Sequence, residues 1–209
     1  MIFYDYLQAP SARRTRMALI EKRIEIETRY IDLGAGEQFS EAFKQINPRC
    51  TLPALMTDEG VVLSDNKAIA QYLESVFPDP PLLGTDRLEQ ALVWEWVGRI
   101  ELDGLGACRD MLRNKLPVFH ERALPGPERH AQIPALVDRG EDQAEFLLLD
   151  LNMRLSHSPW LAGEHFSIAD IAGFVFVEFA DRLHIPIHEG LEALKEWRTV
   201  IAARPSAQA

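Results

Sequence analysis

Apolar and polar residues follow both strand and helix spacing in the first part of this chain. Residues 2–6 are rich in aromatic and apolar side chains, which is typical of a strand. After a proline, apolar residues recur at helical spacing within residues 11–22, and Ser11 is the expected N-cap. Residues 26–32 alternate apolar and polar side chains and predict a second strand. The chain therefore opens with a strand, a helix and a strand.

The next stretch predicts a short helix, a hairpin and a longer helix. Residues 39–46 are helical in pattern, and residues 54–57 and 61–63 are short strands joined by an acidic turn ending in glycine. Residues 66–77 carry an apolar stripe at helical spacing. The order βαβ-α-ββα, a crossover followed by a hairpin, predicts an α/β domain with a mixed four-stranded sheet.

A proline-rich break separates this domain from a second part without strand patterns. We expect a domain at residues 1–78, a linker at 79–85 and an all-helical domain at 86–209. The helical segments are residues 86–116, 135–155, 167–182 and 191–203. Three glycines within the first of these segments indicate a bend or close packing. The proline-rich residues 117–134 predict a loop or a broken helix. In the second segment we expect residues 146–149 to be buried.

The segment at residues 167–182 is nearly all apolar and should be the central helix of the second domain. Ser167 at its N-cap and Asp170 three residues later predict a capping box. We expect this pair to serve folding and not chemistry.

Composition and charge limit the classes of partner that this protein is expected to bind. The 209 residues are 47% apolar and 26% charged, and the net charge of −10 argues against a general nucleic-acid binder. Cys50 and Cys108 lie far apart, and neither they nor the six histidines show metal-ligand spacing. No signal peptide and no apolar run long enough to cross a bilayer is visible. We therefore expect a cytoplasmic protein without a metal, nucleic-acid or membrane partner.

The most informative chemistry surrounds Pro53, at the mouth of the first hairpin strand. A proline cannot donate a ladder hydrogen bond, so it suits the end of a strand beside a ligand pocket. The main chain of Leu52 is then free to bond something other than a neighbouring strand. Asp65 and Asn66 open the next helix, where they can hold amino and carboxylate groups of a ligand. Our working hypothesis is that a small thiol peptide lies across this edge.

Three separated motifs make the whole chain resemble the cytosolic glutathione S-transferases, of a bacterial type with a serine active site. They are Leu-Pro-Ala-Leu at residues 52–55, the segment 63–73, and Gly-x-x-x-Ser-x-Ala-Asp at residues 163–170. The resemblance implies a thioredoxin-like domain that binds glutathione as co-substrate. It also implies a helical domain that supplies a hydrophobic substrate pocket and much of a homodimer interface.

The resemblance assigns the binding residues one by one. Leu52, before Pro53, offers its backbone to the cysteinyl group, while Asp65 and Asn66 take the γ-glutamyl group in place of the family's common Glu and Ser. The alternative is that these two residues only cap the helix. Thr51 matches a position where other members often use longer side chains toward the ligand.

The thiol must lose its proton, because the thiolate is the nucleophile. A hydroxyl donor at a helix N-terminus lowers the thiol pKa, and Ser11 fits both requirements. In some classes the reactive position falls on Ala9, which has no suitable group, and Tyr6 is the alternative from classes that use a first-strand tyrosine. Cys50 replaces a family glycine and is either a small buried thiol or a partner for a mixed disulfide.

Three functions follow from these residues. The first is a detoxifying transferase that adds the glutathione thiolate to a small hydrophobic electrophile. The second is a non-catalytic interaction protein on the same fold. The third is a glutathione-dependent isomerase or a reductase, although a reductase would need a cysteine at Ala9 or Ser11.

Overall fold

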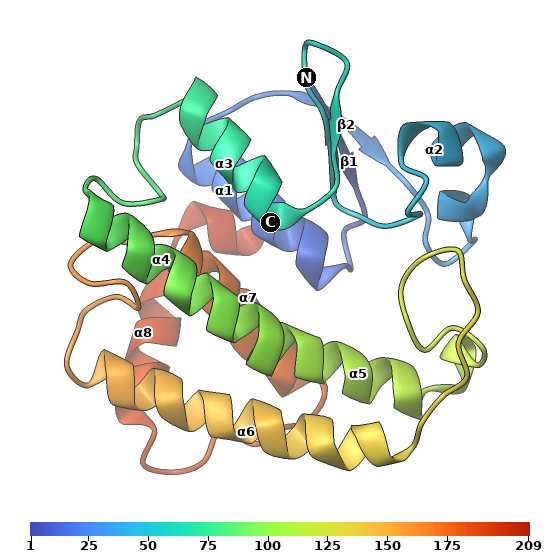
Figure 1. The fold of residues 1–209 in the computed structure, drawn as a ribbon. Coiled ribbons are helices and arrows are strands. Elements are labelled where there is room, and N and C mark those ends of the chain that lie inside the picture. Colours follow the sequence, from blue (N-terminus) through green and yellow to red (C-terminus); the bar gives the residue numbers. More distant parts are fainter. The chain divides into compact units, whose positions relative to one another are not determined.

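The computed structural model describes residues 1–209 and divides them into two compact units (Figure 1). The first unit holds Met1–Pro80 together with Pro125–Glu128 and Ala209. The second holds Pro81–Leu124 and Arg129–Gln208. No helix is both long and apolar enough to span a membrane.

A mixed four-stranded sheet forms the centre of the first unit. Its strands are β1 (Ile2–Asp5), β2 (Glu27–Tyr30), β3 (Ala54–Met56) and β4 (Val62–Leu63). Their order is β2-β1-β3-β4, with β1 parallel to β2 and antiparallel to β3, and with β3 antiparallel to β4. The predicted order of elements and the mixed sheet are confirmed.

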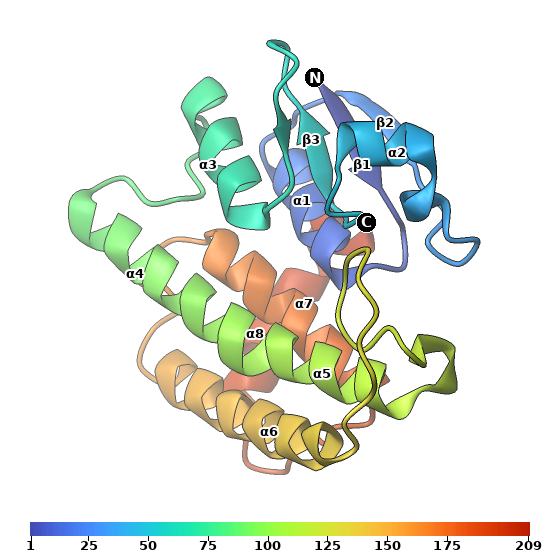
Figure 2. The same ribbon diagram turned by 45° about the vertical axis from the view of Figure 1, so that its right-hand side comes forward.

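Helices cover both faces of this sheet (Figure 2). The helices are α1 (Pro10–Glu21), α2 (Glu41–Ile46) and α3 (Asn66–Val76), with a 3₁₀ turn at Glu37–Phe39. Phe3 of β1 packs with Leu19 of α1 and Leu73 of α3 on one face. Tyr4, the next residue of β1, points to the other face, where its ring meets Phe43 of α2 edge-on at 5.9 Å. Alternation along one central strand thus supplies both cores.

The edge strand β2 departs from expectation. All four of its residues are exposed, so the predicted alternation at residues 26–32 does not divide the strand into a buried and a solvent face. Ile26 and Ile31, immediately outside the strand, provide its buried contacts instead. An edge strand has only one neighbour, and the helices cover little of it.

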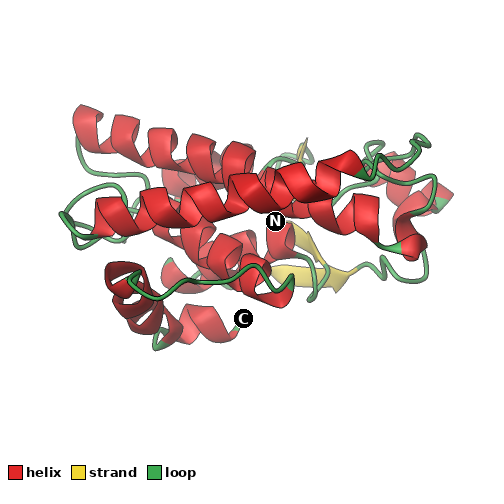
Figure 3. Ribbon diagram, turned by 90° about the horizontal axis from the view of Figure 1, so that it is seen from below, coloured by secondary structure: helices red, strands yellow, loops and turns green.

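The second unit is helical, and the named strands are confined to the first (Figure 3). Its helices are α4 (Arg87–Arg99), α5 (Gly106–Lys115), α6 (Ala135–Leu155), α7 (Ile168–Arg182) and α8 (Glu192–Ala202). A π-helical segment, Ile100–Leu105, joins α4 to α5 where one helix was predicted. Within it, a Cβ on Gly104 would lie 2.7 Å from Leu147 and 2.8 Å from Phe176, so close packing requires glycine there.

Helix α7 is the buried centre of this unit, as predicted. From Ile168 to Val177 each of its residues is buried. The expectation for residues 146–149 is wrong in part, because Phe146 and Leu149 are exposed whereas Leu147 and Leu148 are buried. Four consecutive residues turn through more than one helix face, so they cannot all point to the core.

The capping box at the start of α7 is confirmed and extends beyond the helix. The backbone N–H of Ser167 donates to Asp170 Oδ2 at 3.0 Å. Oδ1 of the same carboxylate accepts the N–H of Leu161 and the indole N–H of Trp197, both at 3.0 Å. Burial raises the pKa of Asp170 to about 6, although these donors favour its charged form. One carboxylate therefore ties together α7, α8 and the loop before α7.

The proline-rich loop after α5 is fixed at its root. The Arg113 guanidinium donates to the carbonyls of Arg122 and Leu124 at 2.6 and 3.0 Å and lies over the Phe119 ring. Burial lowers the pKa of Arg113. The tip of the loop belongs to the first unit, where a Cβ on Gly126 would lie 3.6 Å from the Arg49 carbonyl.

We expect Asp170→Asn to lower the free energy of unfolding by at least ~2 kcal/mol, because the amide nitrogen would face N–H donors. Denaturant unfolding followed by tryptophan fluorescence measures this loss. Asp138→Asn, at an exposed position in the first turn of α6, is the matched control and should change stability little. Equal stability of wild type and Asp170→Asn would contradict the role given to this carboxylate.

Candidate functional site

An unpaired stretch of main chain precedes β3. The Leu52–Pro53 peptide bond is cis, and the backbone N–H of Leu52 has no hydrogen-bond partner in the protein. Strand β4 pairs with β3 only through Leu55 and Met56. Continued along the chain, this register would place Leu52 opposite Asn66, where the chain has already turned into α3. Leu52 therefore lies just beyond the paired end of the hairpin.

Asn47 holds the turn that leads into this edge. Its side-chain amide donates to the Thr51 carbonyl at 2.8 Å and to the Thr51 hydroxyl at 3.3 Å. Its side-chain oxygen, Oδ1, accepts the backbone N–H of Arg49 at 3.1 Å. Asn47 is buried, and with both ends of its amide bonded it fixes the approach to Leu52. The Thr51 hydroxyl thus has a partner within the protein, and its contact with a ligand stays a prediction.

Cys50 occupies a position in this turn that suits glycine. Its φ is 53°, in the left-handed region that residues with a Cβ seldom adopt. The thiol is unpaired with any other cysteine, and the residue is 4% exposed. This burial agrees with the interpretation of Cys50 as a small buried thiol.

Helix α1 brings a hydroxyl to the edge, although not by the predicted route. The expectation that Ser11 is the N-cap is wrong, because the helix begins at Pro10 and its N-cap is Ala9 without a side-chain bond. Proline is well suited to the first helical position. Ser11 is therefore the second helical residue, and its hydroxyl donates to the Leu52 carbonyl at 2.9 Å. The carbonyl oxygen of Leu52 is thus the point at which the Ser11 hydroxyl contacts this edge.

The two alternatives for the active position lie elsewhere or carry no suitable group. The Tyr6 hydroxyl donates to Gln8 Oε1 at 3.2 Å, and a Cβ on Gly34 would lie 3.8 Å from it. It thus points toward the segment that follows β2, whereas Leu52 lies on the other side of β1. Ala9 provides the N-cap backbone alone. Ser11 is the one of the three whose side chain is bonded to the Leu52 edge.

Asp65 and Asn66 open α3 as the sequence indicates, and each has a partner in the protein. Asp65 is the N-cap, and its Oδ1 accepts the N–H of Lys67 at 2.8 Å and of Ala68 at 3.3 Å. Asn66 Oδ1 accepts the hydroxyl of buried Thr15 at 3.0 Å. This bond turns the amide nitrogen of Asn66 away from Thr15, so it can donate to a ligand carboxylate.

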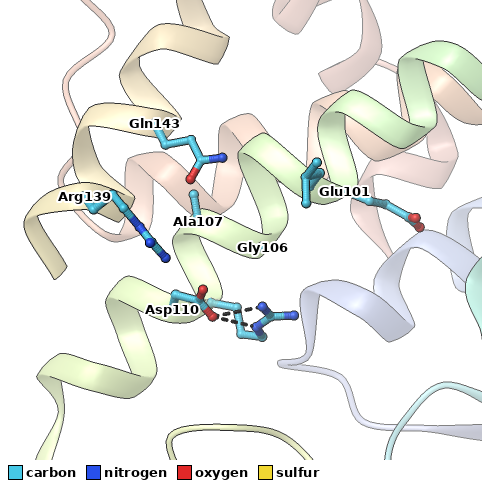
Figure 4. Close-up of a pocket in the computed structure, with 8 residues that line it drawn as sticks. Glu101, Gly106, Ala107, Asp110, Arg139 and Gln143 are labelled. Atoms are coloured by element: carbon cyan, nitrogen blue, oxygen red, sulfur yellow. Dashed lines mark hydrogen bonds and ion pairs between the residues drawn. The ribbon is translucent and has the colours of Figure 1, made fainter. Parts of the chain in front are cut away.

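A separate cavity of about 410 Å³ lies in the second unit, between α6 on one side and the π-helical segment and α5 on the other (Figure 4). Arg139 and Gln143 reach toward it from α6, and Glu101, Arg109 and Asp110 line it from the other side. Arg109 is paired with Asp110 at 2.9 Å. This lining is charged, unlike the apolar lining expected of a pocket for a hydrophobic electrophile.

No group of three or more His, Cys, Asp or Glu side chains is arranged to hold a metal ion. The chemistry available at the Leu52 edge is that of hydrogen-bond donors, a helix N-terminus and a carboxylate.

Known proteins share this architecture. The glutathione S-transferase N-terminal domain family matches residues 9–76, and the C-terminal domain family matches residues 115–205. The disulfide-bond oxidoreductase YfcG of Escherichia coli is 30% identical over 212 residues, covering 99% of this chain and 92% of that protein. A maleylacetoacetate isomerase of Pseudomonas aeruginosa is 37% identical over 93 residues, or 44% of each chain. The crystal structure of Gtt2 from Saccharomyces cerevisiae has a TM-score of 0.90 at 28% identity and covers 100% of this chain and 99% of that one.

A thioredoxin-like sheet unit followed by a helical unit is the two-domain architecture of the glutathione S-transferase fold. The chain belongs to the glutathione S-transferase family. Members of this family use glutathione as a co-substrate.

The sequence patterns did not predict the structural roles of three residues near this site. Thr15 orients Asn66, Asn47 shapes the turn before Leu52, and Arg16 bonds the turn before α1. Asn47 stands before Pro48, and a residue before a proline indicates the end of a helix and not a side-chain role. Thr15 carried one signal, since a polar residue among apolar helix positions needs a partner when it is buried.

Asp65→Asn separates a capping role from a ligand role, because asparagine caps a helix about as well as aspartate. We expect its stability to stay within ~0.5 kcal/mol of wild type and its affinity for glutathione to fall roughly tenfold or more through loss of a charge-assisted bond. Calorimetric titration and denaturant unfolding measure the two quantities.

Asp86→Asn is the matched control, since Asp86 caps α4 through the same pair of bonds, to Leu88 and Glu89. It should leave glutathione affinity unchanged. Wild-type affinity in Asp65→Asn would mean that Asp65 is a cap and nothing more.

Proposed function

We propose that this protein is a glutathione transferase that adds the thiolate of glutathione to a small hydrophobic electrophile. One observation carries the proposal: the Ser11 hydroxyl, at the start of α1, lies 2.9 Å from the carbonyl of Leu52 on the unpaired edge. Residues 1–78 serve as the glutathione-binding domain, residues 79–85 as the linker, and residues 86–209 as the domain for the electrophile and for dimerisation.

Glutathione binds along the Leu52 edge by main-chain hydrogen bonds. Its cysteinyl carbonyl accepts the free N–H of Leu52, and its cysteinyl N–H donates to the Leu52 carbonyl. Asp65 pairs with the γ-glutamyl ammonium, and the Asn66 amide donates to the adjoining carboxylate. Pro53 keeps the edge open because it offers no donor to a neighbouring strand. Thr51 contributes its short hydroxyl beside the same edge.

Ser11 then stabilises the thiolate. When the peptide supplies a donor to the Leu52 carbonyl, the Ser11 hydroxyl is released to turn toward the sulfur. The backbone N–H groups at the start of α1 add their positive partial charge, because the first turn of a helix has no internal acceptors. Both effects favour the anion and lower the thiol pKa, so that more thiolate is present at neutral pH. The thiol proton passes to solvent, and the thiolate forms the C–S bond of the thioether. With an aryl chloride as the electrophile, the C–Cl bond breaks and chloride leaves.

The same fold could instead support isomerisation, disulfide reduction or a non-catalytic role. The similarity to a maleylacetoacetate isomerase favours isomerisation as a second candidate, because that reaction also needs a glutathione thiolate. A disulfide oxidoreductase, the name carried by YfcG, has less support here, since Ala9 and Ser11 stand where a reactive cysteine is wanted and Cys50 is buried. A non-catalytic interaction protein would show no binding of glutathione by calorimetry.

We expect Ser11→Ala to lower kcat/KM for glutathione addition to a small aryl chloride roughly 100-fold, as the loss of one donor to a reacting anion does. Its affinity for S-methylglutathione, which has no thiol, should remain. Ser75→Ala is the control, because Ser75 lies on α3 and donates to the Gln71 carbonyl. Unchanged turnover in Ser11→Ala would reject Ser11 as the activating group.

We also propose that the protein acts as a homodimer. Exposed apolar side chains on the second unit support this: Leu102 lies on the π-helical segment, and Phe146, Leu149 and Met153 follow one face of α6. Leu102 and Phe146 are each 71% exposed, which is unusual for large side chains on adjoining helices unless a partner covers them.

Phe146→Glu should shift the sedimentation coefficient from that of a dimer to that of a monomer, because it places a charge in an apolar contact. Val200→Glu, at an exposed position on α8, is the control and should leave the assembly intact. A dimer that survives Phe146→Glu would place the interface on another surface.

A further inference from the structure

The turn between β1 and α1 is held by one buried ion pair. Asp5, the last residue of β1, is fully buried, and its Oδ1 lies 2.5 Å from the Arg16 guanidinium. The Arg16 side chain is 11% exposed. The same guanidinium donates to the carbonyls of Tyr6 at 3.3 Å and of Leu7 at 2.9 Å. Arg16 therefore binds three consecutive residues at the end of β1 from two turns within α1.

This clamp matters because α1 starts without a side-chain cap. Its N-cap, Ala9, offers only backbone, and the turn is closed by the N–H of Ala9 donating to the Tyr6 carbonyl at 3.0 Å. That carbonyl is one of those that Arg16 also bonds. The position of the first helical turn, and with it the Ser11 hydroxyl, thus depends on contacts made by Arg16.

The pair is poorly arranged to contribute stability. Asp5 Oδ2 and Arg16 Nε are both buried without a hydrogen-bond partner. Burial raises the pKa of Asp5, although the Arg16 charge beside it acts in the opposite direction. A buried pair with unpaired atoms costs desolvation that its attraction repays incompletely. The main effect of the Asp5–Arg16 pair is therefore to fix the geometry of the turn between β1 and α1.

We propose that Arg16 and Asp5 are positioning residues that set the place of the Ser11 hydroxyl against the Leu52 edge and so the acidity of the bound thiol. The inference rests on the proposed function of Ser11. Neither residue is hydrogen-bonded to Leu52, and both act through the turn at Tyr6–Ala9.

Arg16→Lys tests this inference, because lysine keeps the charge and reaches Asp5 but cannot bond two carbonyls at the same time. We expect amide exchange in residues 6–13 to rise at least about tenfold and the pKa of the bound thiol to rise by about one unit. Thiolate absorbance followed against pH measures that pKa, and hydrogen-exchange mass spectrometry measures the exchange. Affinity for S-methylglutathione should change by less than about threefold.

Arg23→Lys is the matched control, since the exposed Arg23 side chain makes no hydrogen bond or ion pair, and it should change neither quantity. Asp5→Asn is the second variant, used if Arg16→Lys fails to fold, and it should shift both quantities in the same direction. A wild-type thiol pKa in a less stable Arg16→Lys protein would show a purely structural role and overturn the inference alone. A wild-type protein that binds S-methylglutathione without lowering the thiol pKa of glutathione would instead overturn the proposed function of Ser11.

Discussion

The unpaired main chain at Leu52 is the constraint on which the rest of the first unit depends. The N–H of this residue has no partner, and its carbonyl bonds the Ser11 hydroxyl of α1. A buried N–H without a partner costs about 1–3 kcal/mol, so such groups persist where something else completes them. Asn47 fixes the turn before it, and Pro53 after it excludes a further strand. The sheet is thereby kept open at one place.

The polar side chains of Ser11, Asp65 and Asn66, which are proposed to bind glutathione, all have partners within the protein. Ser11 bonds Leu52, Asp65 caps α3, and Asn66 accepts from Thr15. These bonds orient the groups in advance, which reduces the entropy that a ligand must overcome on binding. In the proposed mechanism Asp65 and Asn66 keep these bonds when the ligand binds, and only Ser11 must give up its bond before the chemistry begins.

Much of this arrangement was predictable from the sequence because it rests on local rules. Strand and helix spacing indicated the order of elements, and Ser167 with Asp170 indicated the capping box. The start of α1 was misplaced because both Pro10 and Ser11 are favourable near a helix start, and only tertiary contact decides between them. The roles of Thr15 and Asn47 depend on partners distant in sequence or on a turn geometry that no periodic pattern records.

If glutathione binds as proposed, it pairs with the free N–H of Leu52. The most direct measurement is the exchange rate of this single amide, followed by NMR during titration with glutathione. We expect exchange at Leu52 to slow strongly as the site fills, because its N–H gains an acceptor. An amide that exchanges at the same rate in the saturated protein would contradict this mode of binding.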